Sequence, residues 1–116
     1  MLIRDNRIIN VKIVNNTDKQ AIILYFDQII TNWINQNSNE WFCINDLLDF
    51  GIGQHKDWNG TPLQVLYDNY INSGKTEEQA HTQAGKDAGK LLKETVHNRI
   101  EQFDTKKLRH MYYKKI

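Results

Sequence analysis

The residues best suited to chemistry lie near the C-terminus, where five of the fifteen Lys and Arg residues fall between Lys106 and Lys115. Residues 1–105 hold the other ten basic residues and all fourteen Asp and Glu residues. A local excess of positive charge is typical of a surface that binds a polyanion, and tyrosines within it can stack on bases. The candidate partner-binding residues are Lys106, Lys107, Arg109, Tyr112, Tyr113, Lys114 and Lys115. Contact with nucleic acid or an acidic protein is one interpretation; the other, which we favour because basic ends are common, is a solvated end whose lysines protect an edge strand.

The polar loop at residues 55–59 is the second candidate site. His55 and Asp57 supply a base and a carboxylate, and Trp58 and Asn59 supply an aromatic wall and an amide. A small enzyme or metal-binding protein built on this loop is therefore the alternative function. The spacing matches no metal-binding motif, and the competing interpretation is that Trp58 anchors the loop while Asp57 and Asn59 cap turns. We expect that structural role, and we assign no catalytic residue, metal or cofactor.

A patch of small residues lies within the longest expected helix. Glycine in a helix interior costs about 1 kcal/mol relative to alanine, so two glycines there require a reason. Such a face lets another backbone approach closely. We expect the first long helix to cover it, with a second copy of the chain or a ligand as alternatives. Charged residues between the small ones exclude the membrane form of this spacing. The patch comprises Ala84, Gly85, Ala88 and Gly89.

The motifs of common enzyme classes are absent from the sequence. It contains no phosphate-binding glycine loop, no GxSxG elbow and no HExxH pair. Cys43 is the single cysteine, so no disulfide can form within the chain, and its apolar neighbours indicate a buried side chain. We therefore expect a small non-enzymatic binding or regulatory protein that contacts a protein or a nucleic acid, with self-association as a further expectation.

Length and composition fit one compact domain over residues 1–116. The chain is 40% hydrophobic and 25% charged, as ordinary globular domains are. No apolar stretch approaches the roughly 18 residues of a membrane span, and residues 1–7 lack the apolar core of a signal peptide. We expect a cytoplasmic protein without a membrane partner. Thirteen Asn and fourteen Ile are typical of an AT-rich genome, such as that of a low-GC bacterium or a mobile element.

The elements that must position these residues begin with a strand and a long helix. Residues 7–14 are rich in β-branched side chains that alternate with polar ones, which predicts a strand. Thr17 is expected to cap a helix that ends near Asn35. Apolar residues recur along this helix at Ile22, Phe26, Ile29, Ile30 and Trp33.

Two shorter helices are expected next. Asn45 is expected to cap a short helix over residues 46–50, which Gly51 ends. Thr61 and Gln64 form a capping-box pattern at the start of a helix that continues to residue 72. This local signal is the most specific one in the chain.

The last expected helix is the longest. Thr76 and Gln79 repeat the capping-box pattern, and the helix is expected to run over residues 77–103. Its apolar stripe comprises Ala80, Ala84, Ala88, Leu91, Leu92, Val96, Ile100 and Phe103. Residues 106–116 form either a final strand or a loose tail. The sequence thus predicts a helix-dominated α+β fold with about four helices and one or two short strands from the N- and C-terminal segments.

The element order over residues 18–73 resembles that of winged-helix DNA-binding domains, in order alone. In that resemblance the helix at residues 62–72 would be the recognition helix. It carries no Lys or Arg and includes Asp68, which argues against reading of a major groove.

Overall fold

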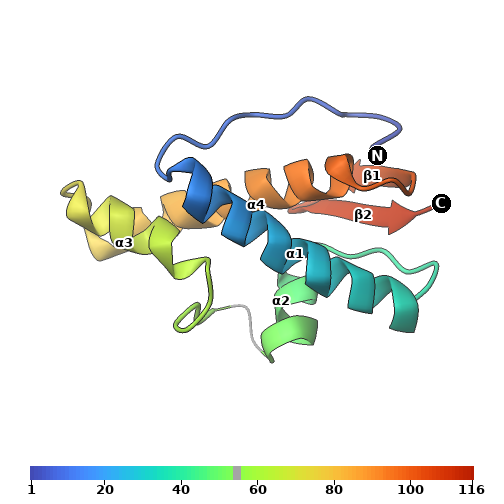
Figure 1. Cartoon of the computed structure of the whole chain (residues 1–116), viewed down its shortest axis with the longest axis horizontal. Helices are drawn as coiled ribbons and strands as arrows, with labels where there is room; N and C mark the ends of the chain where they lie inside the picture. The colour runs from blue at the N-terminus through green and yellow to red at the C-terminus, as the bar shows by residue number, and fades with distance from the viewer. Residues whose placement is uncertain (54–55) are drawn as a thin grey trace.

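The computed structural model describes residues 1–53 and 56–116 of the chain. Within these residues four helices precede one antiparallel β-hairpin (Figure 1), which confirms the expected helix-dominated α+β class. The elements are α1 (Asn16–Gln36), α2 (Ile44–Ile52), α3 (Gln64–Asn72), α4 (Glu77–Asn98), β1 (Phe103–Lys107) and β2 (Met111–Lys115). In the described part of the chain, no helix is long and apolar enough to cross a membrane.

The α4 helix is the central element of the fold. Both α1 and α3 lie against it, and α2 packs on α1 (Figure 1). The inner face of α4 is buried at Ala80, Ala84, Ala88, Leu91, Leu92 and Val96. The inner face of α1 is buried at Ile22, Phe26, Ile29 and Ile30. The apolar spacing seen in the sequence therefore marks the faces that form the core.

The start of α4 is the capping box expected from the sequence. The Gln79 N–H donates to the Thr76 hydroxyl at 3.2 Å, and the Thr76 N–H donates to the Gln79 side-chain oxygen at 3.1 Å. These reciprocal bonds satisfy donors that the first turn of a helix leaves without partners.

The end of α4 lies at Asn98, earlier than the sequence predicted. The backbone becomes extended at Arg99, with a ψ of 153°. The Arg99 guanidinium binds the carboxylates of Asp27 in α1, at 2.6 Å, and Glu101, at 2.7 Å. These charge-assisted hydrogen bonds hold the turn against α1. Ile100, which was expected on the buried stripe, is consequently 97% exposed.

The N-terminal segment does not form the strand predicted over residues 7–14. Leu2 makes one parallel bridge to Phe103 of β1, and the chain then returns without regular structure to the start of α1 (Figure 1). Val11 and Val14 are buried along this path. Val11 and Val14 therefore join the core, although residues 7–14 pair with no strand in the described structure.

Two helix starts differ from the sequence prediction. The Asn15 side chain caps α1, where it accepts a hydrogen bond from the Asp18 N–H at 2.8 Å, and Thr17 lies inside the helix. The α2 helix begins after Cys43, whose N–H donates to the Asp46 carboxylate at 3.0 Å. In each case the polar side chain that satisfies a free N–H group lies within two residues of the expected cap.

The α2 helix is also longer than expected. Asn45 lies in its first turn, and the helix passes through Gly51 to Ile52. A Cβ atom at Gly51 would lie 2.8 Å from the Ile29 side chain, so glycine is needed there for close packing on α1. Gly53, at a φ of 84°, ends the helix instead.

The capping box expected at Thr61 does not form. The Gln64 side chain donates to Asp68 at 3.1 Å, within α3. The Thr61 hydroxyl donates to the Trp58 carbonyl at 2.8 Å and accepts from the Leu63 N–H at 3.2 Å. Thr61 therefore ties the preceding loop to the turn that leads into α3.

Phe42 joins the hairpin to the helices. Its N–H and carbonyl pair with the backbone of Tyr113 in β2, both at 2.8 Å. Its ring packs on Tyr113 and Phe103, with ring centres 5.8 and 6.4 Å apart. The next residue, Cys43, is 3% exposed, which confirms the buried side chain expected from its neighbours.

Replacement of Leu91 by alanine tests the core assignment. Leu91 is 1% exposed, so Leu91→Ala should lower the free energy of unfolding by about 2–5 kcal/mol. Ile100→Ala, at an exposed site, should change it by less than about 0.5 kcal/mol. Urea denaturation followed by circular dichroism measures both values, and equal effects would show that the helix faces are misassigned.

Candidate functional site

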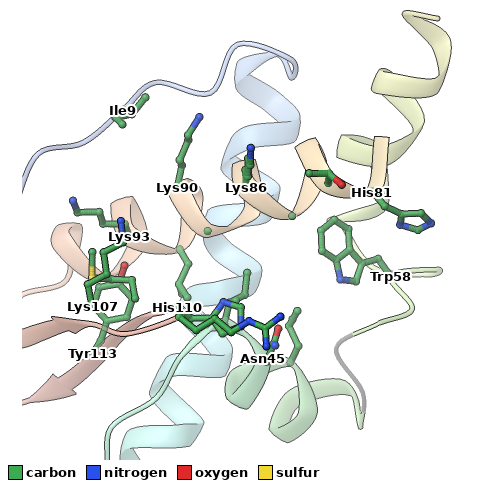
Figure 2. A pocket seen from close by; sticks show the side chains of 18 residues that line it. Ile9, Asn45, Trp58, His81, Lys86, Lys90, Lys93, Lys107, His110 and Tyr113 are labelled. Atoms are coloured by element: carbon green, nitrogen blue, oxygen red, sulfur yellow. The ribbon is translucent and has the colours of Figure 1, made fainter. Parts of the chain in front are cut away.

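The α4 helix and the hairpin border a hollow of about 920 Å³ (Figure 2). Five cationic side chains line it, three from α4 and two from the hairpin. They are Lys86, Lys90, Lys93, Lys107 and Arg109. His81 and His110 add two imidazoles, and no Asp or Glu lies among the described residues that line the hollow. This surface, the basic hollow, is suited to an anionic group.

The spacing of residues along α4 explains why its lysines face the basic hollow. Gly85, Lys86, Gly89, Lys90 and Lys93 recur three and four positions apart, so they share one side of the helix. The alanine and leucine side chains between them are buried in the core. Burial of the apolar stripe therefore turns the lysines outward.

The register of the hairpin divides its cations between two surfaces. Lys107 lies opposite Met111, and both line the basic hollow together with Arg109 from the turn. Lys106 lies opposite Tyr112 on the other surface, because successive residues of a strand face opposite sides. The basic segment is therefore not one continuous patch.

The other surface of the hairpin groups lysines around Trp41. The Lys106 ammonium lies 4.4 Å from the centre of the Trp41 ring and 5.8 Å from that of Tyr112. The Lys114 ammonium lies 5.9 Å from the Trp41 ring. These aromatic rings are thus already engaged in cation–π contacts within the chain. Lys115 is exposed at the far end of the hairpin and borders a separate small hollow.

Tyr113 is not available to stack on a base. Its side chain is 1% exposed, and burial raises its pKa well above the ordinary value. The alternation that turns Tyr112 outward turns Tyr113 into the core. Its ring therefore offers no face for stacking, although its buried side chain forms part of the wall of the basic hollow.

Unpaired positive charge remains in the basic hollow. Lys90 lies 3.7 Å from the Asp87 carboxylate, and Lys93 lies 3.1 Å from that of Asp5. Three cations have no such carboxylate contact among the described residues: Lys86, Lys107 and Arg109. Since like charges gathered in a concave surface reinforce one another, the hollow attracts anions.

The structure divides the small-residue patch. Ala84 and Ala88 are buried in the core, whereas Gly85 and Gly89 line the basic hollow. A Cβ atom at either glycine would meet no atom within 4 Å. The expectation that α1 covers the glycines is therefore wrong. They leave the backbone of α4 uncovered where it borders the hollow.

The polar loop is described in part. His55 lies outside the described residues, and Asp57, Trp58 and Asn59 lie within them. The Asp57 carboxylate accepts a hydrogen bond from the Asn59 N–H at 2.9 Å, in the turn-capping role expected from the sequence. Trp58 lines the basic hollow. Over residues 1–53 and 56–116, no three His, Cys, Asp or Glu side chains are placed to hold a metal ion.

The basic hollow unites parts of all three candidate sites. Arg109 comes from the basic segment, Gly89 from the small-residue patch and Trp58 from the polar loop. Sequence reasoning missed the lysines of α4, although Lys86 and Lys90 each directly follow a patch glycine. That shared spacing was the available signal.

Comparisons with known proteins add no identity to this geometry. Neither a protein-family model, nor a curated protein, nor a solved structure matches the chain. The function must therefore be argued from the site itself.

A buried carboxylate lies beside the basic hollow on α4. Asp87 is 5% exposed and accepts a hydrogen bond from the Tyr70 hydroxyl of α3. Burial and this bond to a carboxylate raise the pKa of Tyr70 to about 12. The protonated phenol therefore helps to hold α3 against α4.

The pKa of Tyr70 predicts a loss of stability at high pH. An unfolded tyrosine has a pKa of about 10, whereas Tyr70 in the folded chain has one of about 12. The stability that this phenol contributes is fully present below pH 10 and is lost as the pH rises to about 12. We expect Tyr70→Phe to flatten the fall of the unfolding free energy across this range, measured by urea denaturation. An unchanged slope would contradict the Tyr70–Asp87 contact.

The uncovered glycines predict an unusual gain in stability. Gly85→Ala and Gly89→Ala should each raise the free energy of unfolding by about 0.5–1 kcal/mol, because alanine favours the helix and meets no neighbour. Gly51→Ala is the matched control and should destabilise, because its Cβ would contact Ile29. Thermal melts compare the three variants. Destabilisation by Gly85→Ala would mean that this glycine is packed after all.

Proposed function

We propose that this chain is a non-enzymatic nucleic-acid-binding protein that holds sugar–phosphate backbone in the basic hollow. The observation that carries the proposal is the lining of the hollow, where, among the described residues, five cations from two elements meet without a lining carboxylate. Contacts from lysine and arginine to phosphates supply most of the affinity in nucleic-acid complexes. Cations on both a helix and a hairpin turn can contact successive phosphates of one strand.

The glycines of α4 support phosphate as the bound group. Gly85 and Gly89 lower the stability of the helix, and no packing contact requires them. Their absent side chains let an outside group approach the helix backbone between Lys86 and Lys90. The phosphates of a nucleic acid belong to its backbone, so the strand itself must approach the helix closely. A carboxylate at the end of a long acidic side chain can reach the lysines without such an approach.

The order of elements also supports the proposal by analogy. The α4 helix directly precedes the hairpin, and Phe42 pairs with Tyr113 of the second hairpin strand. In winged-helix order, the helix before the hairpin is the recognition helix. The sequence placed that helix at residues 62–72, but the helix directly before the hairpin is α4, which carries Lys86, Lys90 and Lys93, whereas α3 carries no Lys or Arg.

Salt-dependent binding tests the proposal. Fluorescence polarisation with labelled DNA and RNA oligonucleotides should show affinity that falls linearly with salt concentration on logarithmic axes. Lys86→Gln/Arg109→Gln removes two unpaired cations, one from α4 and one from the hairpin. The slope of the logarithm of affinity against the logarithm of salt concentration should become less steep by about 2.

The matched control is Lys12→Gln/Lys75→Gln, which makes the same change of charge at exposed residues outside the basic hollow. It should leave the salt dependence nearly unchanged. Absence of binding by the unmodified chain, or equal effects of the two double variants, would overturn the proposal. Absence of nucleic-acid binding by the unmodified chain would point to an acidic protein partner.

A further inference from the structure

A second hollow of about 630 Å³ adjoins the basic hollow. The two share four lining residues: Asn45, Trp58, His81 and Gly85. Figure 2 shows Trp58 and His81 together at one end of the basic hollow, with Lys93 and Lys107 at the other. A ligand can therefore extend from the cationic end past Trp58 into the second hollow, which we call the aromatic hollow.

The chemistry of the aromatic hollow differs from that of the basic hollow. In the part of the chain that the structure describes, three rings line it, those of Trp58, Tyr67 and His81. The Tyr67 and His81 rings pack with their centres 4.6 Å apart and their planes inclined by 39°. Lys56 and Asp57, opposite in sign, are the charged residues in its described lining. The surface is thus aromatic and close to neutral, unlike the surface beside it.

Neutral amides complete the lining of the aromatic hollow. They belong to Asn45, Asn59 and Gln64. The Gln64 amide nitrogen donates to Asp68, and its oxygen accepts no hydrogen bond among the described residues. The side chains of Asn45 and Asn59 have no hydrogen-bond partner among the described residues. Paired donors and acceptors of this kind match the edges of nucleobases.

We propose that the aromatic hollow receives an unpaired base of a single-stranded nucleic acid whose phosphates lie in the basic hollow. This inference rests on the proposed function and names its substrate class. In a duplex the faces of the bases are stacked and their pairing edges are occupied, so only an unpaired or extruded base can enter. The chain should therefore bind single strands more tightly than duplexes of the same length.

Trp58→Leu tests the proposal through the ratio of single-strand to duplex affinity. Loss of one stacking ring should weaken single-strand binding about five- to a hundredfold and should lower the ratio of single-strand to duplex affinity. Trp41→Leu is the matched control, because Trp41 borders neither hollow. It should leave the ratio unchanged, and a folded Trp58→Leu variant with an unchanged ratio would overturn the inference.

A second variant covers the case in which Trp58→Leu does not fold, since Trp58 also packs against the core. Asn59 is exposed, so Asn59→Ala should fold normally and still weaken single-strand binding selectively. An Asn59→Ala variant with an unchanged ratio would then overturn the inference. The proposed function is tested separately, because Lys86→Gln/Arg109→Gln should weaken single-strand and duplex binding together. Suppose that Lys86→Gln/Arg109→Gln loses binding, while Trp58→Leu and Asn59→Ala keep the single-strand to duplex ratio of the unmodified chain. Binding in the basic hollow would then be supported, and the base site in the aromatic hollow would be contradicted.

Discussion

Burial of one side of α4 is the constraint on which the rest of the structure depends. The apolar stripe of this helix packs against α1, and α3 lies along its N-terminal half. A helix that buries one side must present the other, and here the other side carries Gly85, Lys86, Gly89, Lys90 and Lys93. The core and the basic hollow are therefore two consequences of one helical repeat.

The end of α4 decides where the hairpin lies. Arg99 turns the chain at the point where its guanidinium reaches Asp27 and Glu101, and β1 begins soon afterwards. Phe42 then fixes β2 from the other side through backbone pairing with Tyr113. These two anchors place Lys107 and Arg109 across from the lysines of α4. An ion pair and a short strand pairing thus complete a charged surface that no single element possesses.

Stability and binding make opposite demands on this surface. Glycines weaken the helix, and clustered lysines repel one another. Asp87 and Asp5 offset part of that repulsion by pairing with Lys90 and Lys93, while the other cations of the hollow pair with no carboxylate among the described residues. On the opposite face of the hairpin, cation–π contacts with Trp41 and Tyr112 offset part of the repulsion between Lys106 and Lys114.

The sequence by itself determined the class of fold, the buried stripes of α1 and α4 and the capping box at Thr76, because these depend on spacing and on contacts between near neighbours. Predictions from local sequence were wrong where contacts with residues far away in the chain decide the structure. Arg99 ended α4 through its contact with α1, and the hairpin register turned Tyr113 into the core. The site was beyond sequence reasoning for the same reason. Lys86, Arg109 and Trp58 are far apart in the chain, and only the packing of three elements brings them around one hollow.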